Sequence, residues 1–311
     1  MSVFNESERL LRESIDSILT QTYSDFELII VCDNPSRGDE IQVILDSYND
    51  SRIKYIVNEA NMGLAMSLNT AFKIATADII ARMDADDIAE PNRFECQIKC
   101  FDSQQCDLVF SRYSYIDENS ETLSNYNEQT FFQPQQLSNK IAVDPNIIHH
   151  PTVMFTRDIF EQTGDYRDFP CSQDADLWLR MQECGCRFLM LPDKLLRYRI
   201  NTNSVSSKRW FQQQLTIHYI MKLSLERLQK GHDSFSKENY QKYLQAKGVS
   251  KESKVEALHR SENILYKAAK YKAENKMLKA LALRLYVFAT SGILRDYYLS
   301  VMRKKRLLRL K

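Results

Sequence analysis

One stretch near residue 80 constrains most strongly what this chain can fold into. Residues 77–88 read ADIIARMDADDI, an apolar run that leads directly into three carboxylates. The apolar part suits a buried strand, and buried strands of α/β sheets end at the edge where ligands bind. Asp84, Asp86 and Asp87 then lie together at that edge, where like charges repel unless a cation neutralises them. The stretch predicts a Mg²⁺ or Mn²⁺ site; the alternative is an acidic turn that caps the next helix.

The surrounding sequence alternates strand and helix patterns. Strands are expected at 26–31 and 53–57, and helices at about 38–48 and 64–75. Short connections between such elements indicate a parallel, doubly wound sheet that binds ligands at the carboxyl ends of its strands. Asp33 follows the 26–31 strand, so Asp33 and the acidic cluster are expected to face one crevice of one sheet.

The N-terminal part of this strand and helix pattern contains no glycine-rich phosphate-binding motif. No G-x-G-x-x-G follows the first strand, which disfavours a dinucleotide-binding dehydrogenase. A nucleotidyltransferase shares the sheet and the metal chemistry, but it usually carries a glycine-rich phosphate loop near the N-terminus, and none is visible.

Composition narrows the class of protein further. The chain has 311 residues, with 43% hydrophobic residues, 27% charged residues and a net charge of +1, so it is globular and a poor match for a nucleic-acid-binding protein. No apolar run reaches the roughly 18 residues that a membrane span needs, and the N-terminus has no signal-peptide pattern. The seven cysteines lack zinc-site spacing, which favours reduced cytosolic thiols over a structural zinc.

Four segments in sequence order resemble the nucleotide-binding half of family 2 glycosyltransferases of the GT-A fold. They are SVFNE at 2–6, SILTQTYSDFELIIV at 17–31, NMGLA at 61–65 and DADD at 84–87. Several motifs in the right order are more specific than any one of them. The resemblance implies an α/β fold with a Rossmann-like mixed central sheet flanked by helices. It also implies inverting glycosyl transfer from a nucleotide-sugar, with Mn²⁺ or Mg²⁺ as cofactor.

The resemblance places three polar residues at the nucleotide-sugar donor. Asp33 matches the family carboxylate that hydrogen-bonds the nucleobase, and Asn5 and Asn61 lie in the motifs that contribute to donor binding. An aspartate at a strand end can accept a hydrogen bond from a uracil-type imide N–H. The alternative for Asp33 is a residue that stabilises its own turn.

The resemblance also gives roles to the acidic cluster. Asp84 is expected to contact the ribose or the metal, and Asp86 to be the principal metal ligand. A metal that bridges the diphosphate would offset the charge on the leaving nucleoside diphosphate. Two roles stay open for Asp87: it assists the metal, or it caps the next helix.

The N-terminus departs from the family pattern. The family's first strand normally begins several residues before the position of Ser2, so Met1 falls inside that strand. Two explanations stay open, a late assigned start and a shortened first strand. An incomplete central strand would leave backbone hydrogen-bonding groups of the sheet unpaired.

The segment SQDADLWLRM at 172–181 predicts a helix that carries the catalytic base. An inverting transfer needs one carboxylate to take the proton of the acceptor hydroxyl. Asp174 would project from the first turn, and the resemblance to the family's E-D or Q-D before x-D-L-W-L-R selects it as that base. Asp176 is the alternative base, or it pairs with Arg180 at i, i+4. A further alternative is that the helix dipole favours both acids at this end.

The strand that ends near residue 199 is expected to complete the donor site. The family often has Y-R-x-H here, whereas this chain has Asn201 in place of the histidine. Arg199 is expected to be free to reach the diphosphate, and the alternative is a surface charge on a strand. Ser204, Ser206 and Ser207 are expected to lie in a loop that closes over the donor.

The expected domain organisation is a transferase domain and a helical extension. Residues 1–207 form the GT-A domain, with a nucleotide-binding half at about 1–95 and an acceptor half at about 96–207; residues 208–311 form the extension. The terminal segment 301–311 is basic and amphipathic, which suits an anionic membrane surface. The alternative is a solvated basic end.

The predicted function is inverting, metal-dependent transfer of a sugar, most simply from a UDP-sugar, to a glycan or a lipid-linked saccharide. The expected context is polysaccharide biosynthesis for the cell envelope, with a cytoplasmic location and peripheral contact at the inner face of the plasma membrane. No nucleic-acid partner is expected. The alternatives are a catalytically inactive scaffold that binds nucleotide-sugar or lipid, and a polyprenyl-phosphate glycosyltransferase, which needs less of a general base.

Overall fold

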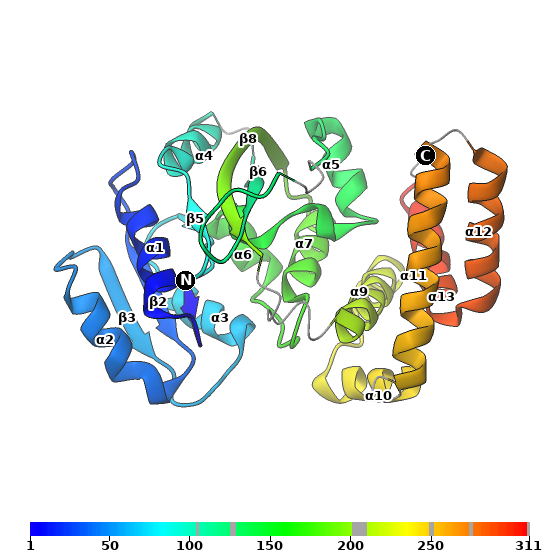
Figure 1. Cartoon of the computed structure of the whole chain (residues 1–311), viewed down its shortest axis with the longest axis horizontal. Coiled ribbons are helices and arrows are strands. Elements are labelled where there is room, and N and C mark those ends of the chain that lie inside the picture. The colour runs from blue at the N-terminus through cyan, green and yellow to red at the C-terminus, as the bar shows by residue number, and fades with distance from the viewer. Residues whose placement is uncertain (104–105, 125–128, 201–209, 249–251, 274–275, 310–311) are drawn as a thin grey trace. The chain divides into compact units, whose positions relative to one another are not determined.

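The computed structural model describes the chain except for residues 104–105, 125–128, 201–209, 249–251, 274–275 and 310–311. It divides into two compact units, Met1–Ser204 and Val205–Lys311. Every described strand belongs to the first unit, and the described part of the second unit is helical (Figure 1). The predicted domain boundary after residue 207 and the predicted serine loop at 204–207 lie outside the described residues.

The first unit begins with three parallel strands in the order β1-β2-β3. These are β1 (Ser2–Val3), β2 (Leu28–Cys32) and β3 (Ile53–Val57), connected through α1 (Glu8–Leu19), η1 (Pro35–Arg37) and α2 (Gly38–Asp46) and followed by α3 (Leu64–Ile74). All five residues of β2 are buried, as its continuous apolar run predicts. Val3 pairs with Cys32 and Cys32 with Val57, so the three strands end level with one another.

The rest of the first unit is built on a mixed five-stranded sheet in the order β4-β7-β6-β8-β5. Parallel pairing joins β6 to β8, and the other neighbours are antiparallel. This arrangement confirms the predicted mixed α/β class. The strands are β4 (Ile79–Ala81), β5 (Ile88–Ala89), β6 (Leu108–Ile116), β7 (Met154–Thr156) and β8 (Phe188–Arg199); the helices are α4 (Arg93–Asp102), α5 (Pro134–Ile141), η2 (Pro145–Ile147), η3 (His150–Thr152), α6 (Arg157–Thr163) and α7 (Gln173–Glu183).

The sequence predicted a single parallel sheet, but the described strands form two sheets that are connected by an isolated bridge. An isolated parallel bridge between Ser2 and Asp84 is what joins β1 to the chain just beyond β4. Because β1 has two residues, its register covers only Val31 and Cys32 of β2. A cavity of about 680 Å³ lies between the start of β2 and β4 and is lined by both strands. The bridge nevertheless holds the acidic turn beside the carboxyl ends of the parallel strands.

Two segments of this sheet depart from regular strand structure. β8 runs through Pro192 as one strand. Its register against β6 jumps from Leu191 to Lys194, so the proline, which has no N–H to donate, lies in a bulge. The apolar run before Phe155 forms two 3₁₀ turns, each starting at or next to a proline, and a strand of three residues.

The second unit contains α9 (Trp210–Lys230), α10 (Lys237–Lys247), α11 (Glu252–Ala273), α12 (Met277–Thr290) and α13 (Gly292–Leu307). Its basic end is not uniformly exposed, because Lys304 is fully buried and its Nζ donates to Ser224 Oγ at 2.6 Å. Within the described part of the chain, no single helix has both the length and the hydropathy for crossing a bilayer. Helices α12 and α13 satisfy that test together, across a bend of 107°.

Candidate active site

A polar edge forms where the three parallel strands end. Asp33 follows β2 and is 4% exposed. Its Oδ1 accepts hydrogen bonds from Asn58 Nδ2 at 2.8 Å and from the Met62 N–H at 2.7 Å, and its Oδ2 accepts from the Gly63 N–H at 2.8 Å. Gly63 has a φ of +83° and precedes α3, so the carboxylate lies at the start of that helix, where negative charge is favoured. Asp33 therefore fixes the loop between β3 and α3.

Two exposed asparagines lie on the same edge. Asn5 follows β1, and its Oδ1 accepts from Asn34 Nδ2 at 3.1 Å. Asn61 Oδ1 accepts from the Gly63 N–H at 3.2 Å. The side-chain amide nitrogens of Asn5 and Asn61 make no hydrogen bond to described residues, so both can donate to a ligand. The structure thus has Asn5, Asp33 and Asn61 in the segments that directly follow β1, β2 and β3.

The acidic turn adjoins this edge and contains a buried cation. Arg82 is 5% exposed and forms an ion pair with the Asp84 carboxylate. Burial alone would lower the pKa of Arg82, but the Asp84 charge raises it above its ordinary value. Ser14 Oγ donates to the Asp84 carbonyl at 2.9 Å, which ties the turn to α1. The sequence interpretation missed Arg82, although an arginine directly after the apolar run of β4 and two residues before Asp84 was a visible signal.

Negative charge exceeds positive charge around this turn. Burial, with the charges of Asp84 and Glu6, raises the pKa of Asp86 to about 7. Burial, with Asp84 and Asp86, raises the pKa of Asp87 well above its ordinary value. Asp87 Oδ1 accepts from the Arg199 backbone N–H at 2.9 Å, and its Oδ2 has no hydrogen-bond partner among the described residues. Asp87 therefore does not cap the next helix, α4, because its hydrogen bond joins the turn to β8.

Arg199 lies inside the protein, which differs from the expected free guanidinium. Its side chain is 1% exposed. The guanidinium donates to the Asp86 carbonyl, the Asp117 carbonyl and Glu13 Oε2, each at 2.7 Å, and to Ser120 Oγ at 3.1 Å. These bonds join β8, α1 and the 117–120 loop to the acidic turn. Arg199 positions the turn and is not available to a diphosphate in this arrangement.

We expect Arg199→Lys to lower the free energy of unfolding by about 3 kcal/mol, because a lysine cannot reproduce the planar set of donors that joins Glu13 to the Asp86 and Asp117 carbonyls. Chemical denaturation measures the change. Arg197→Lys, two residues away on β8 and more exposed, is the matched control and should stay within about 0.5 kcal/mol of the parent. Equal stability of the two variants, with a raised donor KM for Arg199→Lys alone, would instead support direct contact with the diphosphate.

The residues present fit a divalent cation held jointly with a substrate. Within the described residues, no three His, Cys, Asp or Glu side chains form a ready-made metal cage. Mg²⁺ and similar ions are commonly held by one or two carboxylates together with substrate phosphates. Asp84 and Asp86 supply such oxygens, and burial together with the charges of Asp84 and Glu6 raises the pKa of Asp86, so its negative charge is disfavoured without a further cation. A bound cation would supply that balance.

Helix α7 carries a further carboxylate, Asp174, on which the charges of the acidic turn act. Ser172 has a φ of +57° and turns the chain directly into the helix, whose first turn carries Asp174. Burial raises the pKa of Asp174, and the charges of Arg82 and Asp84 both act on it. No cation pairs with the Asp174 carboxylate among the described residues.

Asp176, the alternative base, has a different environment. It is 0% exposed, and Arg180 Nε donates to its Oδ2 at 2.8 Å. Arg167 Nε lies 3.7 Å from the same oxygen. Because this carboxylate is engaged by two cations, Asp176 stabilises the helix and its surroundings.

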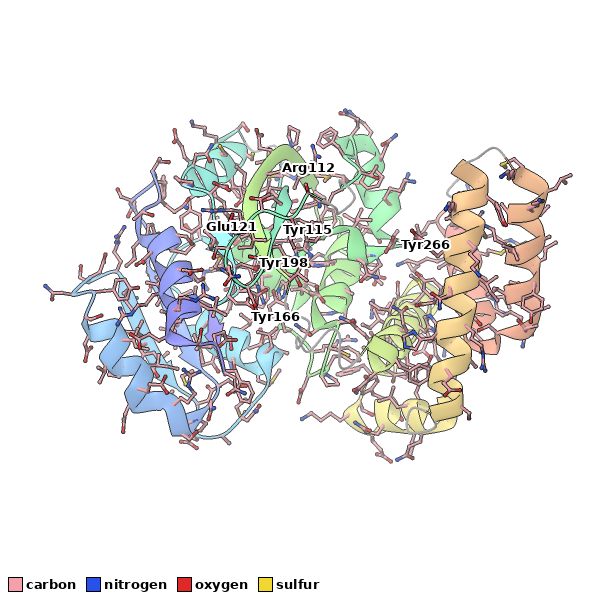
Figure 2. All side chains as sticks on the ribbon, in the orientation of Figure 1. Arg112, Tyr115, Glu121, Tyr166, Tyr198 and Tyr266 are labelled. Carbon is pink, nitrogen blue, oxygen red and sulfur yellow. The ribbon has the colours of Figure 1, made fainter. Side chains whose placement is uncertain are left out.

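An aromatic group beside the acidic turn was not predicted. The His149 ring stacks on Tyr113 at 4.2 Å and meets the Tyr198 ring edge-on at 4.3 Å. Tyr115 on β6 and Tyr198 on β8 have ring centroids 6.1 Å apart and are labelled in Figure 2. Burial, together with the charges of Asp87, Asp84 and Asp86, raises the pKa of Tyr198. The alternation Tyr113-Ser-Tyr115 was the sequence signal.

The chain matches the model of Glycosyl transferase family 2 over residues 1–164. By class it is a glycosyltransferase. It belongs to glycosyl transferase family 2, as the motifs predicted.

Three relatives illustrate this relationship. An uncharacterised glycosyltransferase of Methanocaldococcus jannaschii is 35% identical over 71% of this chain and 77% of its own length. The O-antigen biosynthesis glycosyltransferase WbnJ of Escherichia coli is 38% identical over 61% of this chain and 74% of its own length. The UDP-Glc:alpha-D-GlcNAc-diphosphoundecaprenol beta-1,3-glucosyltransferase WfgD of Escherichia coli is 29% identical over 66% and 77%.

Two solved structures share the fold. The mannosyltransferase PcManGT of Pyrobaculum calidifontis, in complex with GDP-Man and Mn²⁺, superposes with a TM-score of 0.57 and 17% identity, covering 100% of this chain and 86% of that one. Residues 1–349 of S. aureus TarS, in complex with UDP-GlcNAc, give a TM-score of 0.57 and 14% identity, covering 78% and 69%. The full TarS chain is longer, and 41% of it is covered. The GT-A fold prediction is confirmed.

Proposed function

We propose that the chain is an inverting, metal-dependent glycosyltransferase that moves a sugar from a UDP-sugar to a hydroxyl of a glycan or lipid-linked saccharide. One observation carries the proposal: Asp174 is a half-buried carboxylate without an ion-pair partner among the described residues, and the charge of Asp84 in the acidic turn acts on it. A base close to a diphosphate-binding turn is the arrangement that in-line attack requires. WfgD, whose name specifies UDP-Glc, and the TarS complex with UDP-GlcNAc support a uridine donor.

The polar edge is proposed to hold the nucleoside. Asp33 accepts from the nucleobase imide through the one lone pair, on Oδ2, that its three protein hydrogen bonds leave unused, while it keeps the 58–63 loop in place. Asn5 and Asn61 donate their side-chain amide N–H groups to the donor. In this proposal the edge recognises the nucleotide, and the sugar is recognised by other residues.

Asp33→Asn tests the nucleobase role. The amide replaces one acceptor oxygen by a donor, so it cannot satisfy the facing N–H groups of the loop and also accept from the base. We expect the donor KM to rise more than about tenfold, with a smaller fall in kcat. Steady-state kinetics with varied donor concentration measures both. A thermal destabilisation with an unchanged donor KM would limit Asp33 to its loop-holding role.

The acidic turn is proposed to hold Mn²⁺ or Mg²⁺ through Asp84 and Asp86, with Asp84 also near the ribose. The ion would offset the charge that develops on the leaving nucleoside diphosphate. Arg82 holds Asp84 from inside the protein, and Arg199 holds the Asp86 main chain, so the turn is fixed before a ligand arrives. The Mn²⁺ in the PcManGT complex supports metal use in this fold.

Asp174 is proposed to take the proton of the acceptor hydroxyl as that oxygen attacks the anomeric carbon. The raised pKa increases its basicity, and attack from the face opposite the leaving diphosphate inverts the configuration. A polyprenyl-phosphate acceptor is already ionised and would need no such base. The pairing of Asp176 with Arg180 leaves Asp174 as the proposed base.

The proposed context is surface-polysaccharide biosynthesis in the cytoplasm, at the inner face of the plasma membrane. The names of WbnJ and WfgD specify O-antigen biosynthesis and a diphosphoundecaprenol-linked acceptor, which support it. We assign the transferase domain to residues 1–207, with nucleotide-binding and acceptor halves at about 1–95 and 96–207, and the helical extension to 208–311. The basic terminal segment is assigned to peripheral contact with anionic lipid.

The first test is Mn²⁺-dependent hydrolysis of a panel of nucleotide-sugars. Metal-dependent release of UDP from one donor is expected, and the productive donor identifies the sugar. Nucleotide-sugar binding without hydrolysis, and without transfer to any saccharide acceptor, would identify the inactive scaffold instead. Absence of both binding and turnover would overturn the transferase proposal.

The raised pKa of Asp86 also predicts how the metal-free protein responds to pH. The folded-state pKa is about 7 against an ordinary value of 3.8, so between about pH 4 and pH 7 the unfolded chain releases a proton that the folded chain retains. The free energy of unfolding should therefore fall as the pH rises through this window. Because Asp86 is only half-buried, we expect about 1–2 kcal/mol, less than the full shift would give.

Thermal unfolding in chelator at pH 5 and pH 7 measures this effect. Asp86→Asn should flatten the slope and stabilise the metal-free protein at pH 7. Addition of Mn²⁺ at pH 7 should stabilise the parent and leave the variant unchanged. A parent stability that rises between pH 5 and pH 7 in chelator, with the same slope in the variant, would contradict the assigned environment of Asp86.

A further inference from the structure

Helix α12 exposes an apolar stripe along its length. Leu278 is 84% exposed, Leu281 54% and Leu285 59%. With the exposed Ala282 and Ala289 they recur at i, i+3, i+4, i+7 and i+11, which places all five on one face of the helix. We call these five residues the Leu278 face. The opposite face of α12, which includes Ala280 and Val287, is buried within the second unit, where α12 packs against α11 and α13 (Figure 1).

This pattern is the reverse of an ordinary surface helix. Such a helix turns its apolar stripe inward and its charged residues outward. Residues 277–290 contain no acidic residue, and their two charges are Lys279 and Arg284. At about 100° per residue, Lys279 lies about 100° to one side of Leu278 and Arg284 about 120° to the other. The Leu278 face is therefore an exposed leucine stripe bordered on both sides by cations.

The charge pattern favours a lipid surface as the occupant. Cations that flank an apolar stripe can extend to anionic headgroups while the leucines enter the acyl boundary. Arg303, Lys305 and Arg306 on α13 are exposed as well, and add positive charge to the same unit. Asp296, the acidic residue of α13, is paired with Lys247 at 2.7 Å. The surface thus complements a negatively charged membrane.

The geometry favours lying on the membrane over crossing it. The 14 residues of α12 extend about 21 Å, short of the roughly 30 Å of a hydrocarbon core. The chain then bends by 107° into α13, whose last turn is basic. A short apolar helix followed by a sharp bend and cations suits the plane of the interface.

We propose that the Leu278 face docks on an anionic phospholipid bilayer, with the leucines of α12 inserted at the headgroup boundary and Lys279 and Arg284 on headgroups. This goes beyond contact by the basic terminus, because it assigns the inserting surface to a different helix and to apolar residues. It does not depend on glycosyl transfer, so failure of the activity proposal leaves it intact.

Co-sedimentation of the full chain with vesicles tests the proposal. Vesicles of phosphatidylcholine alone are compared with vesicles that also contain phosphatidylglycerol. The parent should bind the anionic vesicles, and Leu278→Glu/Leu285→Glu should bind them at least about tenfold more weakly. Val43→Glu is the matched control, because Val43 is a 70% exposed apolar residue on α2 in the first unit, and it should bind like the parent.

Two further measurements keep the outcome decisive. Thermal unfolding should be unchanged in both glutamate variants, since all three sites are exposed, which separates lost docking from lost folding. Leu285→Trp should show a blue-shifted emission with anionic vesicles but not with phosphatidylcholine. Equal vesicle binding by the parent and the double variant would overturn the proposal. A second result would also overturn it: the parent forms a dimer, the double variant is monomeric, and neither protein binds vesicles. The Leu278 face would then pack against a second copy of the chain.

Discussion

Asp174→Asn is expected to lower kcat for glycosyl transfer by about 10²–10⁴-fold, with little change in the donor KM. The amide keeps the shape of the side chain but cannot take the proton of the acceptor hydroxyl. Because burial raises the pKa of Asp174, the acidic limb of kcat/KM for the parent should lie above the ordinary aspartate range, with activity lost as the pH falls through it. Initial rates against pH, with the parent and the variant, measure both effects.

Asp176→Asn is the informative comparison for this variant. It removes a carboxylate of the same helix that pairs with Arg180, so it should lower stability and keep most of the activity per folded molecule. A large rate loss in Asp176→Asn with an active Asp174→Asn would exchange the two roles. If both variants turn over at the parental rate, the acceptor does not need a base, and a phosphate acceptor becomes the better explanation.

The second large effect is expected for Asp86→Ala. Without this carboxylate, Mn²⁺-dependent donor hydrolysis and transfer should both fall by about 10³-fold, because the charge on the leaving diphosphate is no longer offset by a properly held ion. The apparent affinity for Mn²⁺ should fall in the same variant. Activity against Mn²⁺ concentration, after removal of bound metal by chelator, separates the two quantities.

Asp78→Asn is the matched control, since Asp78 precedes β4 at the end opposite the acidic turn and is exposed. It should respond to Mn²⁺ like the parent. Metal-independent activity of the parent, undiminished in Asp86→Ala, would remove the ion from the mechanism and leave Asp86 as a carboxylate of the turn.

Local patterns predicted the parts of the fold that depend on neighbouring residues. The apolar run of β2 and the helical spacing of α3 are properties of short segments, and the structure has both near the predicted positions. The family assignment was also accessible, because it depended on motif order. The bulge at Pro192 could not be predicted from the sequence. A proline that interrupts an apolar run fits both a gap between two strands and a bulge within one strand, until the partner strand is known.

The environments of the site residues depended on contacts distant in sequence. Arg199 has the residue type and strand position of a diphosphate ligand, yet its partners Glu13, Asp86 and Asp117 lie 82 to 186 positions away. No local pattern encodes that network. The signal of Arg82 is local by contrast: it is a single cation between the apolar run of β4 and Asp84, its ion-pair partner.

The hydrogen bonds of Arg199 have a consequence for recombination between relatives. They connect α1 and the acidic turn, both before residue 95, with the 117–120 loop and β8, both after it. A crossover at residue 95 that grafts a foreign acceptor half onto this chain would therefore remove the Arg199 guanidinium from Glu13 and the Asp86 carbonyl. A segment exchanged between relatives therefore has to include Glu13, the turn at Asp86 and β8 together.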